Sequence, residues 1–233
     1  MRSPAVHRVT TLDLKVTARP WPFADARRAE ISTHFAAQQR DKPQMWNGRV
    51  LLGCNPVFDG ARLGAEYFET DFASFLCWRD WGFPDKAVFN GFGMGALRSS
   101  DGAFALGEMG NHTANAGRVY FPSGTPDLDD VRDGMLDIPS SVMREVEEET
   151  GLTPAEYRAG AHWDCISTGV AIAMIQILQV DMSGEELRAR IEANLAAQLS
   201  PELSAIHMVR KLSDMSDAMP RFVTAFLEMQ LKA

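Results

Sequence analysis

Apolar residues follow two different spacings along the chain, and each spacing predicts one kind of element. Between Val9 and Val16 they alternate with polar residues, which predicts a half-buried strand. Between Gly169 and Val180 they form a nearly continuous run, which is typical of a central strand covered on both faces. From residue 187 to residue 195 they recur at about every fourth position, which predicts a helix. This mixture of strands and helices indicates an α/β fold class.

Side chains that can cap helices mark the start of two predicted helices. Asp25 is expected to cap a helix that runs to Gln39. Ser183 and Glu186 have the spacing of a capping box, which predicts another helix through Gln198.

Turn-forming residues at positions 82–85 mark a boundary in the chain. Before it, Ala61–Trp78 predicts a strand followed by a helix, with aromatic side chains that we expect to lie mainly in a core. We therefore expect residues 1–85 to form an N-terminal extension or subdomain, and residues 86–233 to form the main core with C-terminal helices.

Small residues alternate with larger apolar residues from Val88 to Arg98, and a Ser-Ser-Asp-Gly turn then leads to a second strand, Ala103–Met109. The turn predicts a hairpin. No helix opens after the glycines, so they do not form a dinucleotide-binding fingerprint. We expect them instead to let another element pack closely against the strand.

An acidic helix follows. Asp137 is expected to cap it, and Gly151 is expected to end it after Thr150. Because an α-helix has 3.6 residues per turn, the carboxylates of Glu145, Glu148 and Glu149 share one face.

Like charges crowded on one helix face are destabilising, and a hard cation such as Mg²⁺ would neutralise them. The cluster therefore predicts a metal site, with a solvated acidic helix face as the alternative. Val142 and Val146 are expected to face the core.

Composition limits the classes of function. A formal charge of −8 over 233 residues argues against a general binder of nucleic acids or membrane surfaces, because both need basic patches. Cys54, Cys77 and Cys165 lack metal-ligand spacing and are expected to be buried, reduced thiols. No apolar run is long enough to span a membrane, and no secretion signal opens the chain. A soluble, cytoplasmic protein is expected.

The segment Arg144–Leu152 resembles the second half of the Nudix hydrolase signature and fits it at every fixed position. In that family the motif forms a loop-helix-loop whose glutamates bind Mg²⁺ or Mn²⁺ beside a diphosphate. The resemblance implies a Nudix-like α/β/α sandwich with a mixed sheet, here with an N-terminal α+β extension.

The first half of the signature departs from the family pattern. Asp130 and Leu136 occupy the positions of a glycine and a glutamate, and Phe121–Thr125 resembles the entry to the motif but comes early. Leu136 removes one expected carboxylate. Asp137 is adjacent and could replace it, although capping is its other expected role.

The resemblance implies a metal-dependent pyrophosphohydrolase that cleaves the diphosphate linkage of a nucleoside diphosphate linked to another group, such as a nucleotide sugar, ADP-ribose, a dinucleotide or a coenzyme A. A small-molecule nucleotide would be the substrate, and a homodimer is compatible with the family. The alternative is a non-catalytic nucleotide-binding or sensor module of the same fold. The resemblance implies that catalysis depends on Glu145, Glu148, Glu149 and Arg144. The metal ion would be bound by Glu145, Glu148 and Glu149. The substrate would be bound by Ser123, Gly124 and His112.

Overall fold

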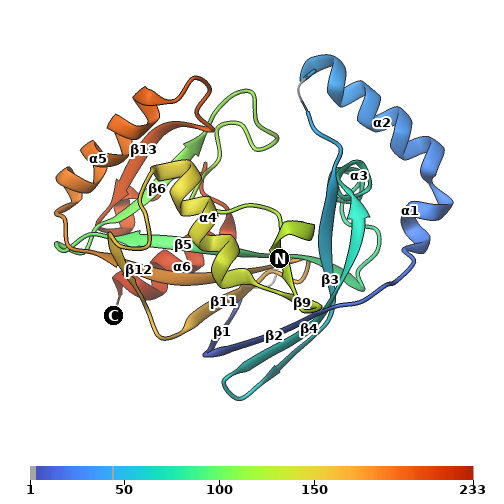
Figure 1. The fold of residues 1–233 in the computed structure, drawn as a ribbon, viewed down its shortest axis with the longest axis horizontal. Helices are drawn as coiled ribbons and strands as arrows, with labels where there is room; N and C mark the ends of the chain where they lie inside the picture. The colour runs from blue at the N-terminus through green and yellow to red at the C-terminus, as the bar shows by residue number, and fades with distance from the viewer. Residues whose placement is uncertain (1–3, 44, 233) are drawn as a thin grey trace.

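The computed structural model describes residues 4–43 and 45–232 (Figure 1). Within these ranges the strands form one mixed sheet, in which β5 and β12 run parallel, β2 and β4 run parallel, and the other neighbours are antiparallel. The strands are β1 Ala5–Val9, β2 Thr11–Val16, β3 Arg49–Asp59, β4 Arg62–Asp71, β5 Val88–Arg98, β6 Phe104–Met109, β7 Val119–Tyr120, β8 Val131–Arg132, β9 Met135–Leu136, β10 Tyr157–Ala159, β11 Trp163–Ser167, β12 Ala171–Val180 and β13 Leu203–Val209.

Helices pack against this sheet, which confirms the predicted α/β class. None of the helices in the described ranges is long and apolar enough to cross a membrane. The helices are α1 Pro22–Ala26, α2 Arg28–Asp41, α3 Phe72–Asp80, α4 Ile138–Thr150, α5 Gly184–Ala197 and α6 Arg221–Leu231, with short 3₁₀ turns η1 Leu128–Asp130 and η2 Leu212–Asp214.

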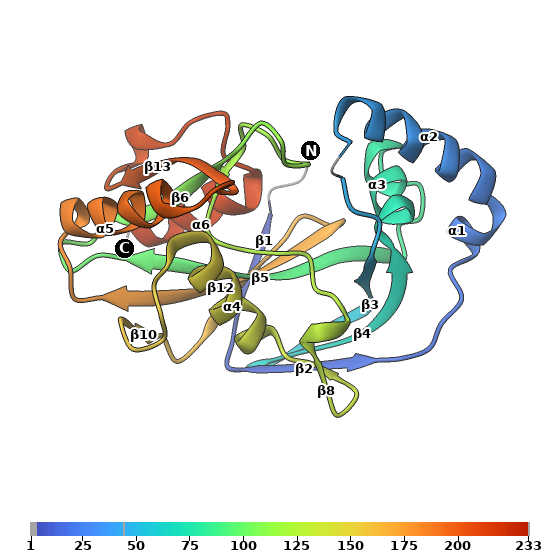
Figure 2. The ribbon, with the colours of Figure 1, turned by 45° about the horizontal axis from the view of Figure 1, so that its top comes forward.

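Strand β5 runs between the part of the molecule that carries α1 to α3 and the part that carries α5 and α6 (Figure 2). Its first residues pair with β3, and the rest of the strand pairs with β12. Alternate side chains of a strand point to opposite faces. On one face Phe92 contacts Phe222 of α6, with ring centroids 5.4 Å apart, so α6 covers this face.

The glycines of β5 admit α4 on the opposite face. A Cβ atom added to Gly93 or to Gly95 would lie 2.5 Å from a methyl group of Val142 or Val146, respectively. Both valines are buried, as their spacing predicted. The expected close packing against the strand is therefore confirmed, and it fixes the distance between the sheet and the helix that carries the glutamates.

Buried apolar side chains form two groups. The larger lies around β5, β12, α4 and α6, and the smaller lies between β3, β4, α2 and α3. Strand β1 pairs with β11, although it falls within the predicted extension. The division of the chain at residue 85 stays a prediction. Cys54, Cys77 and Cys165 are buried free thiols, as expected.

Two predicted elements differ in their bounds. The strand expected from Val9 to Val16 is present as β2 from Thr11, whereas Val9 ends β1, because β1 pairs with β11, β2 pairs with β4 and the chain bends at Thr10. The single helix expected after Asp25 is divided into α1 and α2. Asp25 lies inside α1 and caps nothing, because Pro22 already begins that helix.

Other predictions hold. The strand followed by a helix within Ala61–Trp78 is present as β4 and α3, and Ser183 and Glu186 form the predicted capping box of α5. The predicted hairpin strands are present as β5 and β6. They pair only at Arg98 and Phe104, because β6 diverges to pair with β13.

Candidate active site

Helix α4 is set in place by its two ends. Both oxygens of Asp137 accept hydrogen bonds from Ser140, one from its backbone N–H at 3.1 Å and one from its hydroxyl at 2.7 Å. Gly151 ends the helix in the left-handed conformation, with φ 74°. The predicted helix is therefore confirmed at both ends, and the capping role of Asp137 accounts for both of its oxygens.

The predicted glutamates differ in burial. Glu149 is 4% exposed, the side chain of Glu145 is 15% exposed, and that of Glu148 is 63% exposed. Burial raises the pKa of Glu145 to about 7, although the hydrogen bond from Arg144 acts in the opposite direction. Burial, and then the charge of Glu145, raise the pKa of Glu149 well above its usual value. Glu145 and Glu149 thus form a largely buried carboxylate pair, and the exposed Glu148 lies close enough for its charge to contribute to both raised pKa values.

Arg144 lies between two carboxylates. It donates to Asp130 from Nη1 at 2.7 Å and to Glu145 from Nη2 at 3.1 Å. Arg144 therefore forms a salt bridge with Glu145. The second partner, Asp130, has a side chain only 1% exposed and also accepts a hydrogen bond from the backbone N–H of Asp127. Asp130 stands where the family pattern has glycine, so this pair was not predicted from the sequence.

The segment at Ser123 and Gly124 lies directly against the carboxylate pair. The backbone N–H of Ser123 donates to Glu149 at 3.4 Å. A Cβ atom on Gly124 would lie 2.2 Å from Oε1 of Glu145, so only glycine fits at this position without displacing the carboxylate.

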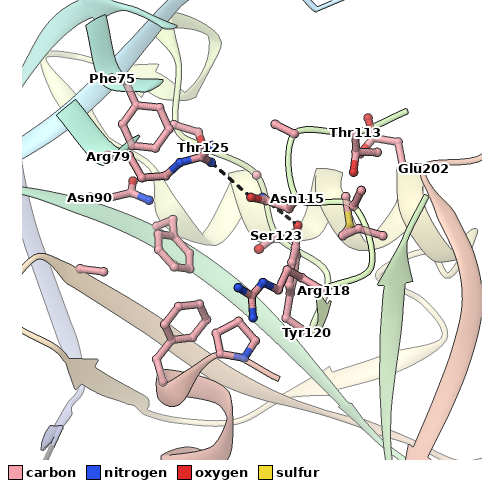
Figure 3. A pocket seen from close by; sticks show the side chains of 18 of the residues that line it. Phe75, Arg79, Asn90, Thr113, Asn115, Arg118, Tyr120, Ser123, Thr125 and Glu202 are labelled. Atoms are coloured by element: carbon pink, nitrogen blue, oxygen red, sulfur yellow. Dashed lines mark hydrogen bonds between the residues drawn. The ribbon is translucent and has the colours of Figure 1, made fainter. Parts of the chain in front are cut away.

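A cavity of about 1210 Å³ opens on the other side of this segment (Figure 3). His112, Ser123 and Gly124, the predicted substrate-binding residues, all line it. Glu145 and Glu149 do not line it, since Ser123 and Gly124 form the wall between the carboxylates and the cavity. The remaining lining includes four basic residues and several aromatic residues: Lys42, Arg79, Arg118 and Arg221, and Trp46, Phe72, Phe75, Phe83, Phe92, Tyr120 and Phe222.

Several lining residues come from parts of the chain that the motif does not cover. Arg79 of α3 donates to Asn115 at 3.3 Å, and Asn115 in turn donates to Tyr120 at 3.2 Å, so α3 is connected to the loop of residues 110–118 (Figure 3). Glu202 also lines the cavity, and its charge contributes to the raised pKa values of the buried carboxylate pair. No local sequence signal identifies these residues, because only the fold brings them together.

A divalent metal ion in a protein needs several oxygen donors that converge on one point. Among the residues that the structure describes, no three Asp, Glu, His or Cys side chains converge closely enough to hold a metal ion. Mg²⁺, however, is commonly held by one or two carboxylates together with substrate phosphates. Glu145 and Glu149 supply two buried oxygen donors whose charges repel each other, and these fit such an ion.

No protein-family model matches the sequence, and no curated protein was found as a relative. The chain resembles the MutT protein from Methanosarcina mazei Go1 at 21% identity and a TM-score of 0.41, over 62% of this chain and 94% of that one. It also resembles RenU, a Nudix hydrolase from M. smegmatis, at 12% identity and a TM-score of 0.38, over 60% and 81% of the two chains. The likeness is one of fold. RenU bears the name of the family that Arg144–Leu152 resembles.

Proposed function

We propose that the protein is a metal-dependent hydrolase that cleaves the diphosphate linkage of a nucleoside diphosphate linked to another group. The observation that carries the proposal is the buried pair of Glu145 and Glu149, which lies directly behind the cavity wall at Ser123 and Gly124. The match of Arg144–Leu152 to the family motif supports the same assignment.

Glu145 and Glu149 would hold the ion, Mg²⁺ or Mn²⁺, and Glu148 would act from the exposed side of the helix. A divalent ion in such a site polarises a phosphoryl group and lowers the pKa of bound water. Burying two carboxylates together is unfavourable without a cation, because each loses hydration and repels the other. The raised pKa values of both groups express this cost.

The other residues have roles that follow from their contacts. Arg144, held by Asp130, fixes the carboxylate of Glu145 by a charge-assisted hydrogen bond. Arg118 and Arg79 supply positive charge to the cavity, where a diphosphate would bind. Gly124 lets the cavity wall approach Glu145 closely, which keeps the distance between substrate phosphates and carboxylates short.

The test is a panel of substrates incubated with the protein and Mg²⁺ or Mn²⁺: nucleotide sugars, ADP-ribose, dinucleotides, coenzyme A and nucleoside triphosphates. Wild type is expected to release nucleoside monophosphate or an equivalent product, and Glu149→Gln is expected to lose turnover. Glu147→Gln is the matched control, because Glu147 is an exposed glutamate of the same helix outside the pair. Glu148→Gln tests whether the exposed glutamate takes part. Absence of any product across the panel would exclude the proposal.

One set of observations favours a second function, a nucleotide-binding module without turnover. Leu136 replaces a carboxylate of the family pattern, and no third carboxylate joins the buried pair among the described residues. Calorimetry separates the two functions. Tight binding of a nucleotide in the presence of metal, with no product on chromatography, would establish the binding module.

A further inference from the structure

The loop between β6 and β7 is open to solvent along its whole length. The structure describes residues 111–118 in full, and none of them is buried. The loop begins after Gly110, whose backbone N–H donates to the carbonyl of Glu202 at 2.7 Å. It ends at Gly117, which has φ 72° and donates to the carbonyl of Met109 at 2.9 Å. Glycine adopts more backbone conformations than other residues, so a loop with a glycine at each end can turn about those ends.

Internal hydrogen bonds give the loop a shape of its own. The backbone N–H of Thr113 donates to the carbonyl of Gly110 at 3.0 Å, and the hydroxyl of Thr113 donates to the same oxygen at 2.9 Å. The backbone N–H of Arg118 donates to the carbonyl of Asn115 at 3.0 Å. A segment that is bonded to itself and has no buried side chain separates from the core at little cost in free energy.

Two cationic side chains from the N-terminal part of the chain hold the loop from across the cavity. Nζ of Lys42, which follows α2, donates to the backbone carbonyl of Thr113. Arg79 of α3 donates to the side chain of Asn115 at 3.3 Å (Figure 3). Helices α2 and α3 belong to the smaller hydrophobic group, whereas the loop starts from the larger one. Single hydrogen bonds between partly exposed groups are weak, so these two contacts can open at equilibrium.

The loop and the two cations line the same cavity. All residues from His112 to Ala116 line it, and so do Lys42 and Arg79. Figure 2 shows the loop after β6 extending towards the end of α2. The two contacts therefore join the two sides of the cavity, and their separation would widen its mouth.

We propose that residues 111–116 are a lid over the cavity, latched by Lys42 and Arg79, and that opening of this latch controls how fast molecules enter and leave. Closure of such a lid excludes water and retains a bound molecule. The lid does not depend on the reaction at the carboxylate pair, so it goes beyond the proposed function and is tested without a substrate.

Chemical labelling of a cysteine inside the cavity measures how often the lid opens. Cys54, Cys77 and Cys165 are buried, so the thiol introduced by Ala171→Cys is the one that a reagent in the cavity reaches. The reagent is DTNB, an aromatic disulfide. The protein thiolate attacks one sulfur of DTNB, a mixed disulfide forms, and the other half leaves as a coloured thiolate whose absorbance gives the rate.

Loss of either latch contact is expected to speed this labelling. In the Ala171→Cys protein, Lys42→Met and Asn115→Ala should each raise the rate about fivefold, the effect of losing one weak hydrogen bond. Asn115→Ala leaves Arg79 in place, so its effect does not come from a changed charge in the cavity. Lys86→Met is the matched control for Lys42→Met. Lys86 donates to a backbone carbonyl at 3.0 Å but is not among the described residues that line the cavity, so its replacement should leave the rate unchanged.

A second labelling position separates opening of the lid from general loosening of the fold. Ala61 is exposed in the turn between β3 and β4, and the thiol introduced by Ala61→Cys should react at the same rate with and without the latch. Hydrogen exchange followed by mass spectrometry should likewise become faster in residues 111–118 and stay unchanged in α4.

Three results would overturn the proposal. The latch variants could leave the labelling of Ala171→Cys unchanged, they could raise the labelling of Ala61→Cys equally, or they could leave the hydrogen exchange of the loop unchanged. Circular dichroism checks that each variant folds.

Discussion

Replacing Asp130 by alanine tests how Arg144 is held beside Glu145. Asp130 accepts hydrogen bonds from Arg144 at 2.7 and 3.4 Å and from the backbone N–H of Asp127 at 3.1 Å. Alanine removes all three acceptor contacts at a position where the native side chain is 1% exposed. The arginine is then left with Glu145 at 3.1 Å and with Glu148 at 4.0 Å.

The size of the effect follows from the burial of the two partners. Removing one partner from a fully buried ion pair costs about 3–5 kcal/mol. The side chain of Arg144 is 34% exposed and keeps Glu145, so water and a second carboxylate compensate part of the loss. The unpaired N–H of Asp127 adds to the cost. We expect Asp130→Ala to lower the free energy of unfolding by about 2–3 kcal/mol, and Asp130→Asn, which keeps an acceptor oxygen, by about 1 kcal/mol.

Urea unfolding, followed by circular dichroism, measures these values, and an unchanged slope with denaturant shows that the change lies in stability. Asp129→Ala is the control, because Asp129 is an exposed neighbour on the same 3₁₀ turn. The double variant Asp130→Ala/Arg144→Ala should lose less than the sum of the single losses, as expected for residues in contact. Additive losses, or an Asp130→Ala loss no greater than that of the control, would refute the role assigned to the pair.

Three further predictions concern the helix supports and the carboxylate pair. Asp71→Ala is expected to lower the free energy of unfolding, measured in urea, by about 1–2 kcal/mol, because Asp71 caps α3 by accepting a hydrogen bond from the backbone N–H of Ser74 at 2.8 Å. A decrease below about 0.3 kcal/mol would contradict the capping role. Gly95→Val is expected to lower the free energy of unfolding by about 1–3 kcal/mol, since a Cβ atom at position 95 would lie 2.5 Å from a methyl group of Val146. An unchanged Tm would show that α4 does not pack closely against β5. Burial raises the pKa of Glu145 in the folded protein to about 7, above its value in the unfolded chain. Between about pH 4.5 and 7 the folded protein therefore binds more protons than the unfolded chain does. Its free energy of unfolding falls as the pH rises through this window. In EDTA, Tm should therefore be lower at pH 8 than at pH 5.5 by more in wild type than in Glu145→Gln, and equal pH responses would contradict this assignment.

Local signals predicted the element that carries the candidate site. Asp137 and Gly151 fix the ends of α4 through contacts within a few residues, and Val142 and Val146 have the spacing of a buried helix face. Such signals depend on neighbours in sequence, so they can be identified without knowledge of the fold.

Features that depend on contacts between segments far apart in the sequence could not be predicted from local patterns. The break at Thr10 exists because the residues on either side of it join different strands. Asp130 was placed by the family pattern at a position for glycine, and only the path of the chain before α4 brings its carboxylate to Arg144. Asn90 and Arg118 belong to separate elements that carry no shared motif, so only the fold places them around one cavity.

The pairing of β1 with β11 has a consequence for how the chain is made. Arg8 donates to Asp164 across this pair, and the two residues are 156 positions apart in sequence. At a synthesis rate of about 5–20 residues per second, the first strand emerges from the ribosome about 10–30 s before its partner exists. During that interval Val6 and Val9 have no sheet to join. The finished position of β1 is therefore reached late, after β11 and β12 have been synthesised.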